Sequence, residues 1–202
     1  MFFEARRRTN ALLVALLLAV LCADALVWAH RASPEAEAAA LDRATLLDPR
    51  PAPPPADPPA GPIAIPENPY APEPVVRIGT ISIPKLGLVH DLYEGVTLTV
   101  IDHGPSHWPG TAMPGQPGNA VVAGHRVTHD HPFLDIDQLK PGDTVSFDVA
   151  GVHSTYRVTG SQIVTPDAVW IADQTPTATA TLYACHPKYS KRLRYVVHLV
   201  LA

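Results

Sequence analysis

A proline-rich segment from Pro49 to Pro74 is the feature that most restricts how this chain can fold. Proline fixes φ and has no amide hydrogen to donate, so the segment cannot form a helix or a central strand. We expect an extended, semi-rigid spacer that separates an N-terminal part from a C-terminal domain. This spacer either gives the domain reach through a wall or periplasm, or is a tether of no specific length.

An apolar run from Ala11 to Ala29, interrupted only by Asp24, follows three consecutive arginines at 6–8. A helix over 11–29 would span roughly 28 Å, close to the hydrocarbon thickness of a bilayer. The arginines before the run favour a cytoplasmic N-terminus. The sequence therefore predicts a basic cytoplasmic tail at 1–10, a transmembrane anchor at 11–29, an extracytoplasmic linker at 30–74 and a folded domain at 75–202.

A cleavable signal peptide is the alternative for the same N-terminal run. Ala23-Asp24-Ala25 resembles a small-residue cleavage site, and a carboxylate inside lipid is costly. We favour the single-pass anchor, because Asp24 lies near the outer end of the helix and could reach the interface. Both interpretations place the domain outside the cytoplasm.

The folded part is predicted to be all-β and mainly antiparallel. Short strands are expected over 76–83, 86–93, 120–123, 143–149, 154–164, 177–184 and 194–201, with short helices at 96–102 and 133–139. Strands of this length between glycine and proline turns are typical of a barrel or a sandwich. The formal net charge of −4, without long runs of one sign, argues against nucleic-acid binding.

Cys185 is the lone thiol of the predicted exported domain, because the other cysteine, Cys22, lies in the apolar run. A leftover cysteine in an exported protein indicates reactivity or intermolecular pairing. A buried, unreactive thiol is the equally weighted alternative. Cys185 ends a strand just before His186-Pro187, and Lys188, Lys191, Arg192 and Arg194 follow it. Nearby cations lower the pKa of a thiol, so this position favours a nucleophile.

His125 and Arg194 are the candidate partners of Cys185. His125 follows the predicted strand 120–123, and an imidazole at a strand end can exchange protons with an amine. Arg194 begins the last strand, where antiparallel pairing would return it to Cys185. A guanidinium there could stabilise an oxyanion or hold a carbonyl, although a surface arginine is the commoner interpretation of one such residue.

Two segments resemble the sortase family. The glycine- and proline-rich stretch 104–119, followed by Val121-Val122-Ala123-Gly124-His125-Arg126, is similar to the histidine region of sortases. Thr181-Leu182-Tyr183-Ala184-Cys185, followed by Arg194, is similar to their Thr-Leu-x-x-Cys strand and distal arginine. The resemblance covers about 75–202 and is greatest to class E, the housekeeping group of actinobacteria.

This resemblance implies a sortase-type eight-stranded β-barrel and a cysteine transpeptidase that needs no cofactor and no metal. Cys185 would cleave a Leu-Pro/Ala-x-Thr-Gly sorting signal between threonine and glycine and form a thioacyl intermediate. His125 would protonate the departing amine and deprotonate the incoming one, while Arg194 would stabilise the oxyanion. The implied partners are surface proteins that carry sorting signals, a peptidoglycan precursor or other amine acceptor, and the membrane.

Three further residues are expected at the substrate groove: Trp108, Thr181 and Ala184. Class E members commonly have tyrosine where Trp108 stands, so the choice between proline and alanine in the signal stays open. Ala184 stands where threonine is more usual. Arg192 shares strand parity with Arg194 and is a possible substitute for it.

Two other functions compete with this interpretation. His125, His129, Asp130 and His131 could form the metal site of a hydrolase, but Pro132 argues against the helix that would align the first two. A non-catalytic wall-binding or scaffold domain could use aromatic side chains such as Trp108, Trp170 and Tyr70. Thiol chemistry separates these functions, because only the transpeptidase requires Cys185.

Overall fold

The computed structural model describes residues 61–202. The predicted cytoplasmic tail, the anchor at 11–29 and the linker up to residue 60 lie outside the described residues. Within 61–202, no helix combines the length and the hydropathy needed to cross a bilayer.

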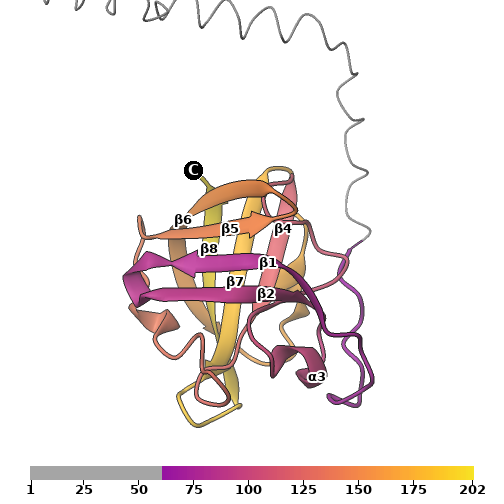
Figure 1. Ribbon diagram of the computed structural model, residues 1–202. Helices are drawn as coiled ribbons and strands as arrows, with labels where there is room; N and C mark the ends of the chain where they lie inside the picture. The colour runs from indigo at the N-terminus through magenta and orange to yellow at the C-terminus, as the bar shows by residue number, and fades with distance from the viewer. Residues whose placement is uncertain (1–60) are drawn as a thin grey trace, which may run out of the picture. The chain divides into compact units, whose positions relative to one another are not determined.

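Eight strands form a closed barrel in the order β1-β2-β3-β4-β7-β8-β6-β5, and β5 pairs back with β1 (Figure 1). The strands are β1 (Val76–Ile83), β2 (Leu88–Glu94), β3 (Ser106–His107), β4 (Gly118–Ala123), β5 (Thr144–Val149), β6 (Val152–Val164), β7 (Ala178–His186) and β8 (Leu193–Leu201). The β2–β3 and β4–β7 pairs are parallel, and the remaining pairs are antiparallel. The predicted all-β, mainly antiparallel eight-stranded barrel is confirmed.

Four short helical segments connect the strands, as predicted for a barrel with short helices. They are η1 (Pro84–Leu86), α3 (Leu98–Ile101), η2 (Ile136–Gln138) and η3 (Val169–Ala172). The second strand begins at Leu88 rather than at the predicted residue 86, because Pro84 starts a 3₁₀ turn that Gly87 ends with a φ of 62°. The sequence pattern predicts neither β3 nor η3.

Alternate residues of the strands fill the interior of the barrel. Phe147 and Tyr156 meet edge to face there, with ring centroids 5.6 Å apart. The hydroxyl of Tyr156 accepts a 2.7 Å hydrogen bond from the Gly115 amide, and burial raises the pKa of Tyr156. This core makes the barrel wall rigid, so residues on the outer face of β4 and β7 hold fixed positions.

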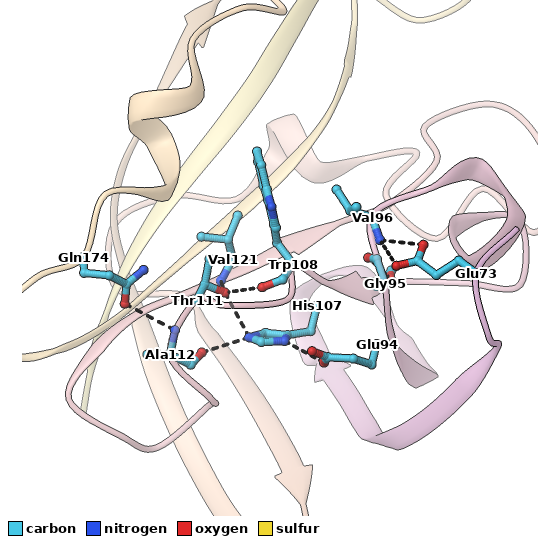
Figure 2. Close-up of polar contacts among 11 residues, drawn as sticks. Glu73, Glu94, Gly95, Val96, His107, Trp108, Thr111, Ala112, Val121 and Gln174 are labelled. Atoms are coloured by element: carbon cyan, nitrogen blue, oxygen red, sulfur yellow. Dashed lines mark hydrogen bonds and ion pairs between the residues drawn. The ribbon is translucent and has the colours of Figure 1, made fainter. Parts of the chain in front are cut away.

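The end of the proline-rich segment packs against the barrel. The Glu73 carboxylate accepts a hydrogen bond from the amide of Val96 (Figure 2) and another from the amide of Thr97, and the Pro69 carbonyl accepts one from Leu98. Proline removes donors but leaves carbonyls, and these acceptors satisfy amides of the barrel.

Candidate active site

A groove of about 750 Å³ opens on the outer face of the barrel, over the parallel strands β4 and β7. Its walls are largely apolar and come from four places: residues 65–69, the helix α3, the segment 165–171 and the loop after β7. Tyr183 and Trp108 both line it, with ring centroids 6.3 Å apart. An apolar groove of this size can hold an extended peptide several residues long.

Cys185 and Arg194 are paired residues of the antiparallel strands β7 and β8, and both line the groove. The Cys185 side chain is free and partly exposed, so it is not a core residue. Arg194 Nη1 donates to the carbonyls of Lys191 and Leu193 at 2.9 and 3.0 Å, which fixes the guanidinium beside the strand end. The predicted return of Arg194 to the neighbourhood of Cys185 is confirmed.

Tyr183 lies two residues before Cys185, on the same face of β7. Burial raises the pKa of Tyr183 to about 12, and the nearby Arg194 charge opposes this rise only in part. Tyr183 therefore remains a neutral phenol at the groove floor. The Arg194 charge is left available for an anionic group that enters the groove.

His125 lines the same groove and follows Gly124 directly after β4. A Cβ on Gly124 would lie 2.5 Å from the Phe133 ring, so glycine is required for this chain path. The imidazole Nε2 lies 2.7 Å from Asp102 Oδ1, at the C-terminal end of α3. Because a carboxylate only accepts hydrogen bonds, Nε2 carries a proton, and Nδ1 is the nitrogen left for proton exchange.

The histidine cluster that the sequence offered as a competing metal site forms only in part. His129 Nδ1 lies 3.4 Å from Asp102 Oδ1, and the rings of His125 and His129 are 4.8 Å apart. Asp130 is instead 3.8 Å from His90, and His131 contacts the carbonyl of His129. Asp102 was not predicted as a site residue, because it lies 23 residues from His125, directly after the short helix α3.

Arg126 is a second residue whose role was not predicted from the sequence. Its side chain is almost fully buried, and its Nη2 lies 2.6 Å from Asp137 Oδ2. Its Nη1 donates to His186 Nδ1 at 2.7 Å, and its guanidinium lies over the Tyr195 ring. Since Arg126 follows His125 and His186 follows Cys185, this contact connects the two strand ends that carry the candidate residues.

Only some of the positively charged residues that follow Cys185 in the sequence line the groove that holds its thiol. Lys191 and Arg194 line the groove, whereas Lys188 pairs with Asp135 at 2.7 Å. The hydrogen bond from Lys188 lowers the pKa of Asp135. Arg192, the alternative to Arg194 that strand parity allowed, is exposed and does not line the groove.

Two of the three expected groove residues line the groove, and one does not. Trp108 and Ala184 are groove residues. Thr181 is buried, and its hydroxyl donates to Asn119 Oδ1 at 3.0 Å. Asn119 in turn donates to the Ile171 carbonyl, so Thr181 supports the η3 wall from below.

Trp108 is held by contacts on both sides. Its indole N–H donates to the Ile63 carbonyl at 2.8 Å, which leaves only carbon atoms of the ring to face the groove. Beneath it, Figure 2 shows the buried His107 between the Glu94 carboxylate on one side and Ala112 and Thr111 on the other. This network fixes the backbone that carries Trp108.

Comparisons with known proteins agree with this fold and this groove. Residues 81–202 match the family model of the sortase domain. The chain is 32% identical over 146 residues to sortase SrtE1 of Streptomyces coelicolor, a match that covers 64% of this chain and 42% of that protein. The crystal structure of sortase E1 from the same organism superimposes with a TM-score of 0.59 at 26% identity, covering 63% of this chain and 88% of that one.

A sortase D5 transpeptidase of Clostridium perfringens is similar in structure, with a TM-score of 0.58 at 29% identity over 62% of this chain and 79% of that one. The chain belongs to the sortase family. Its similarity to SrtE1 and to the sortase E1 structure agrees with the predicted class E resemblance. The chain spans less than half the length of the curated relatives it matches.

Proposed function

We propose that this protein is a cysteine transpeptidase. It cleaves a Leu-Pro/Ala-x-Thr-Gly-like sorting signal between threonine and glycine and joins the acyl product to a cell-wall amine. The observation that carries this proposal is the pairing of Cys185 with Arg194 across β7 and β8, in the groove that also contains His125. The apolar walls suit the leucine of the signal, and the relative from S. coelicolor has been described with a tripeptide in its active site.

The first half of the reaction forms a thioester. The Cys185 thiolate attacks the threonine carbonyl carbon, and Arg194 stabilises the negative charge that develops on the carbonyl oxygen. The carbon–nitrogen bond to glycine then breaks, and the His125 imidazolium gives its proton to the departing amine. The acyl group is left on the sulfur, and His125 is left neutral.

The second half releases the acyl group. The incoming amine gives a proton to neutral His125 as it attacks the thioester carbon, and the carbon–sulfur bond breaks to return the thiolate. The guanidinium of Arg194 again faces the oxyanion. Asp102 positions the imidazole throughout, through the 2.7 Å bond to Nε2. Trp108 and Ala184 are proposed to contact the signal, because both line the groove.

The proposed location of the protein in the cell rests on the sequence prediction. We propose a single-pass membrane protein, held by the apolar run at 11–29, with the catalytic domain on the outer side. Its partners would be surface proteins that carry sorting signals and a peptidoglycan precursor or other amine acceptor.

Intact-mass spectrometry tests this function. Incubation of the protein with a sorting-signal peptide should add the mass of the acyl fragment in wild type and not in Cys185→Ala. Addition of a diamino acceptor should remove the adduct and release the joined product. Absence of an adduct under conditions of peptide turnover would refute the thioester route. Full turnover by Cys185→Ala would refute the role of the thiol and leave the metal-dependent alternative.

A further inference from the structure

We propose that Asp102, His125 and His129 form a binding site for zinc, and that zinc held there inhibits the enzyme. The three side chains each place one ligand atom within 4.8 Å of the other two. Asp102 comes from the end of α3, whereas the two histidines come from the loop after β4. The backbone of His129 has a φ of 51°, which turns its ring back toward His125 without a helix.

The donor atoms suit a tetrahedral zinc ion. Asp102 Oδ1 lies 2.7 Å from His125 Nε2 and 3.4 Å from His129 Nδ1. Ligand atoms at about 2.1 Å from a tetrahedral ion lie roughly 3.4 Å apart, so small rotations bring all three into place. Two imidazoles and a carboxylate form the donor set of many open zinc sites, in which water is the fourth ligand.

The position of the three side chains allows a zinc ion both to enter the site and to be held there. The side chains of His125 and Asp102 are 15% and 24% exposed, and that of His129 is 43% exposed. An ion can therefore enter from the His129 side, while the two less exposed residues hold it at the edge of the groove. If the Asp102 carboxylate served only to orient His125, it would need to contact only that one imidazole. The second imidazole on the same oxygen is what indicates a metal site.

Zinc at this site would stop proton exchange by His125, a consequence that rests on the proposed function. An imidazole whose Nε2 lone pair is bound to a metal carries its only proton on Nδ1. It then has no lone pair left to accept a proton from the incoming amine. Substrate could still enter the groove, but the second half of the reaction could not be completed.

Binding is tested on the untagged full chain with cobalt as a spectroscopic substitute and zinc in competition with a chromogenic chelator. A thiol-free variant, Cys22→Ser with Cys185→Ala, separates the cluster from the two sulfurs. We expect this variant to bind one ion. His129→Asn should weaken zinc binding by more than about 10-fold, because losing even a residue that only supports a metal ligand lowers metal affinity by at least that factor. His153→Asn is the matched control, because His153 forms an exposed pair with Asp148 at 2.7 Å without a second imidazole.

Three binding results would overturn the site. The first is loss of binding in the thiol-free variant, and the second is a thiolate-to-cobalt charge-transfer band in wild type. The third is unchanged affinity in His129→Asn. These measurements do not depend on turnover, so they decide the metal site even if the peptide is not cleaved and the proposed function fails.

Inhibition is tested with a fluorogenic sorting-signal peptide at increasing free zinc, each variant being compared with its own rate without metal. The wild-type rate should fall and recover when a chelator is added. The zinc concentration for half inhibition should rise by more than about 10-fold in His129→Asn and stay at the wild-type value in His153→Asn. Zinc bound at the cluster without loss of turnover would overturn the inhibitory role.

Discussion

Arg126 Nη1 donates a 2.7 Å hydrogen bond to His186 Nδ1, which joins the residue after His125 to the residue after Cys185. The two strand ends lie on neighbouring parallel strands, yet each is followed by a loop of its own. A buried guanidinium between them therefore sets how the imidazole and the thiol lie relative to each other.

Replacement of Arg126 by methionine is expected to destabilise the domain by about 2–3 kcal/mol and to lower the rate of peptide cleavage. Asp137 and His186 would lose a charged donor, although Asp137 is partly exposed and water would compensate in part. Urea unfolding measures the first effect, and kcat/KM under native conditions measures the second. Arg157→Met, at an exposed position of β6, is the control and should change neither. Wild-type stability in Arg126→Met would contradict the structural role.

Replacement of Arg194 by lysine should lower kcat by about 10²–10³-fold, as the loss of one oxyanion donor does in other enzymes. Lysine keeps the charge but not the planar set of donors that Nη1 anchors to Lys191 and Leu193. Steady-state kinetics with a sorting-signal peptide gives the answer. Arg192→Lys, outside the groove, should retain the wild-type rate, and equal losses in the two variants would argue against a specific role for Arg194.

The Trp108 indole connects the groove to the N-terminal segment. Trp108→Phe removes the donor to the Ile63 carbonyl, at a cost of about 1 kcal/mol, and keeps an aromatic ring. We expect faster hydrogen exchange at the Ile63 amide, which bonds to Pro109, and a changed preference between Leu-Pro and Leu-Ala peptides. Trp170→Phe, at an exposed site of η3, should leave the exchange rate unchanged. Unaltered exchange in Trp108→Phe would show that the segment is held by other contacts.

The half-buried His198 makes stability depend on pH. Burial lowers the pKa of His198 from its ordinary value of 6.5, and its Nε2 accepts a 2.7 Å hydrogen bond from the Gln162 amide. As the pH is lowered, His198 therefore takes up a proton at a higher pH in the unfolded chain than in the folded protein. The free energy of unfolding consequently falls as the pH drops below about 6.5. Urea unfolding at about pH 7.5 and pH 5.5 should show a smaller fall in the free energy of unfolding between these two pH values in His198→Gln than in wild type. Equal falls would exclude His198 as a source of the pH dependence.

Most of the barrel is predictable because its strands carry a two-residue period. The strand at 76–83 was predicted with its observed bounds, and the pairing of Cys185 with Arg194 followed from the short loop between them. β3 escaped prediction because it has only two residues, inside a segment dominated by glycine and proline. β3 forms because it pairs with β2 and β4, and the local sequence carries no pattern that predicts this pairing.

The site was predictable only where the chain itself carries a pattern. Cys185, His125 and Arg194 stand at strand ends, which the sequence indicates. Asp102 and Arg126 act through contacts with residues distant in sequence, Asp102 with His125 and Arg126 with His186. Thr181 shares the face of Cys185, but Asn119 covers its hydroxyl, and this could be found only from the packing.

The register between β7 and β8 makes the separation of the Cys185 and Arg194 backbones independent of the loop that joins them, and only the guanidinium also contacts that loop, at the Lys191 carbonyl. The ladder of pairs from Thr179 to His186 fixes that separation before the chain turns. Tyr189 and Ser190 border the groove, so related enzymes could exchange these two side chains and acquire a new peptide preference without rebuilding their reactive centre.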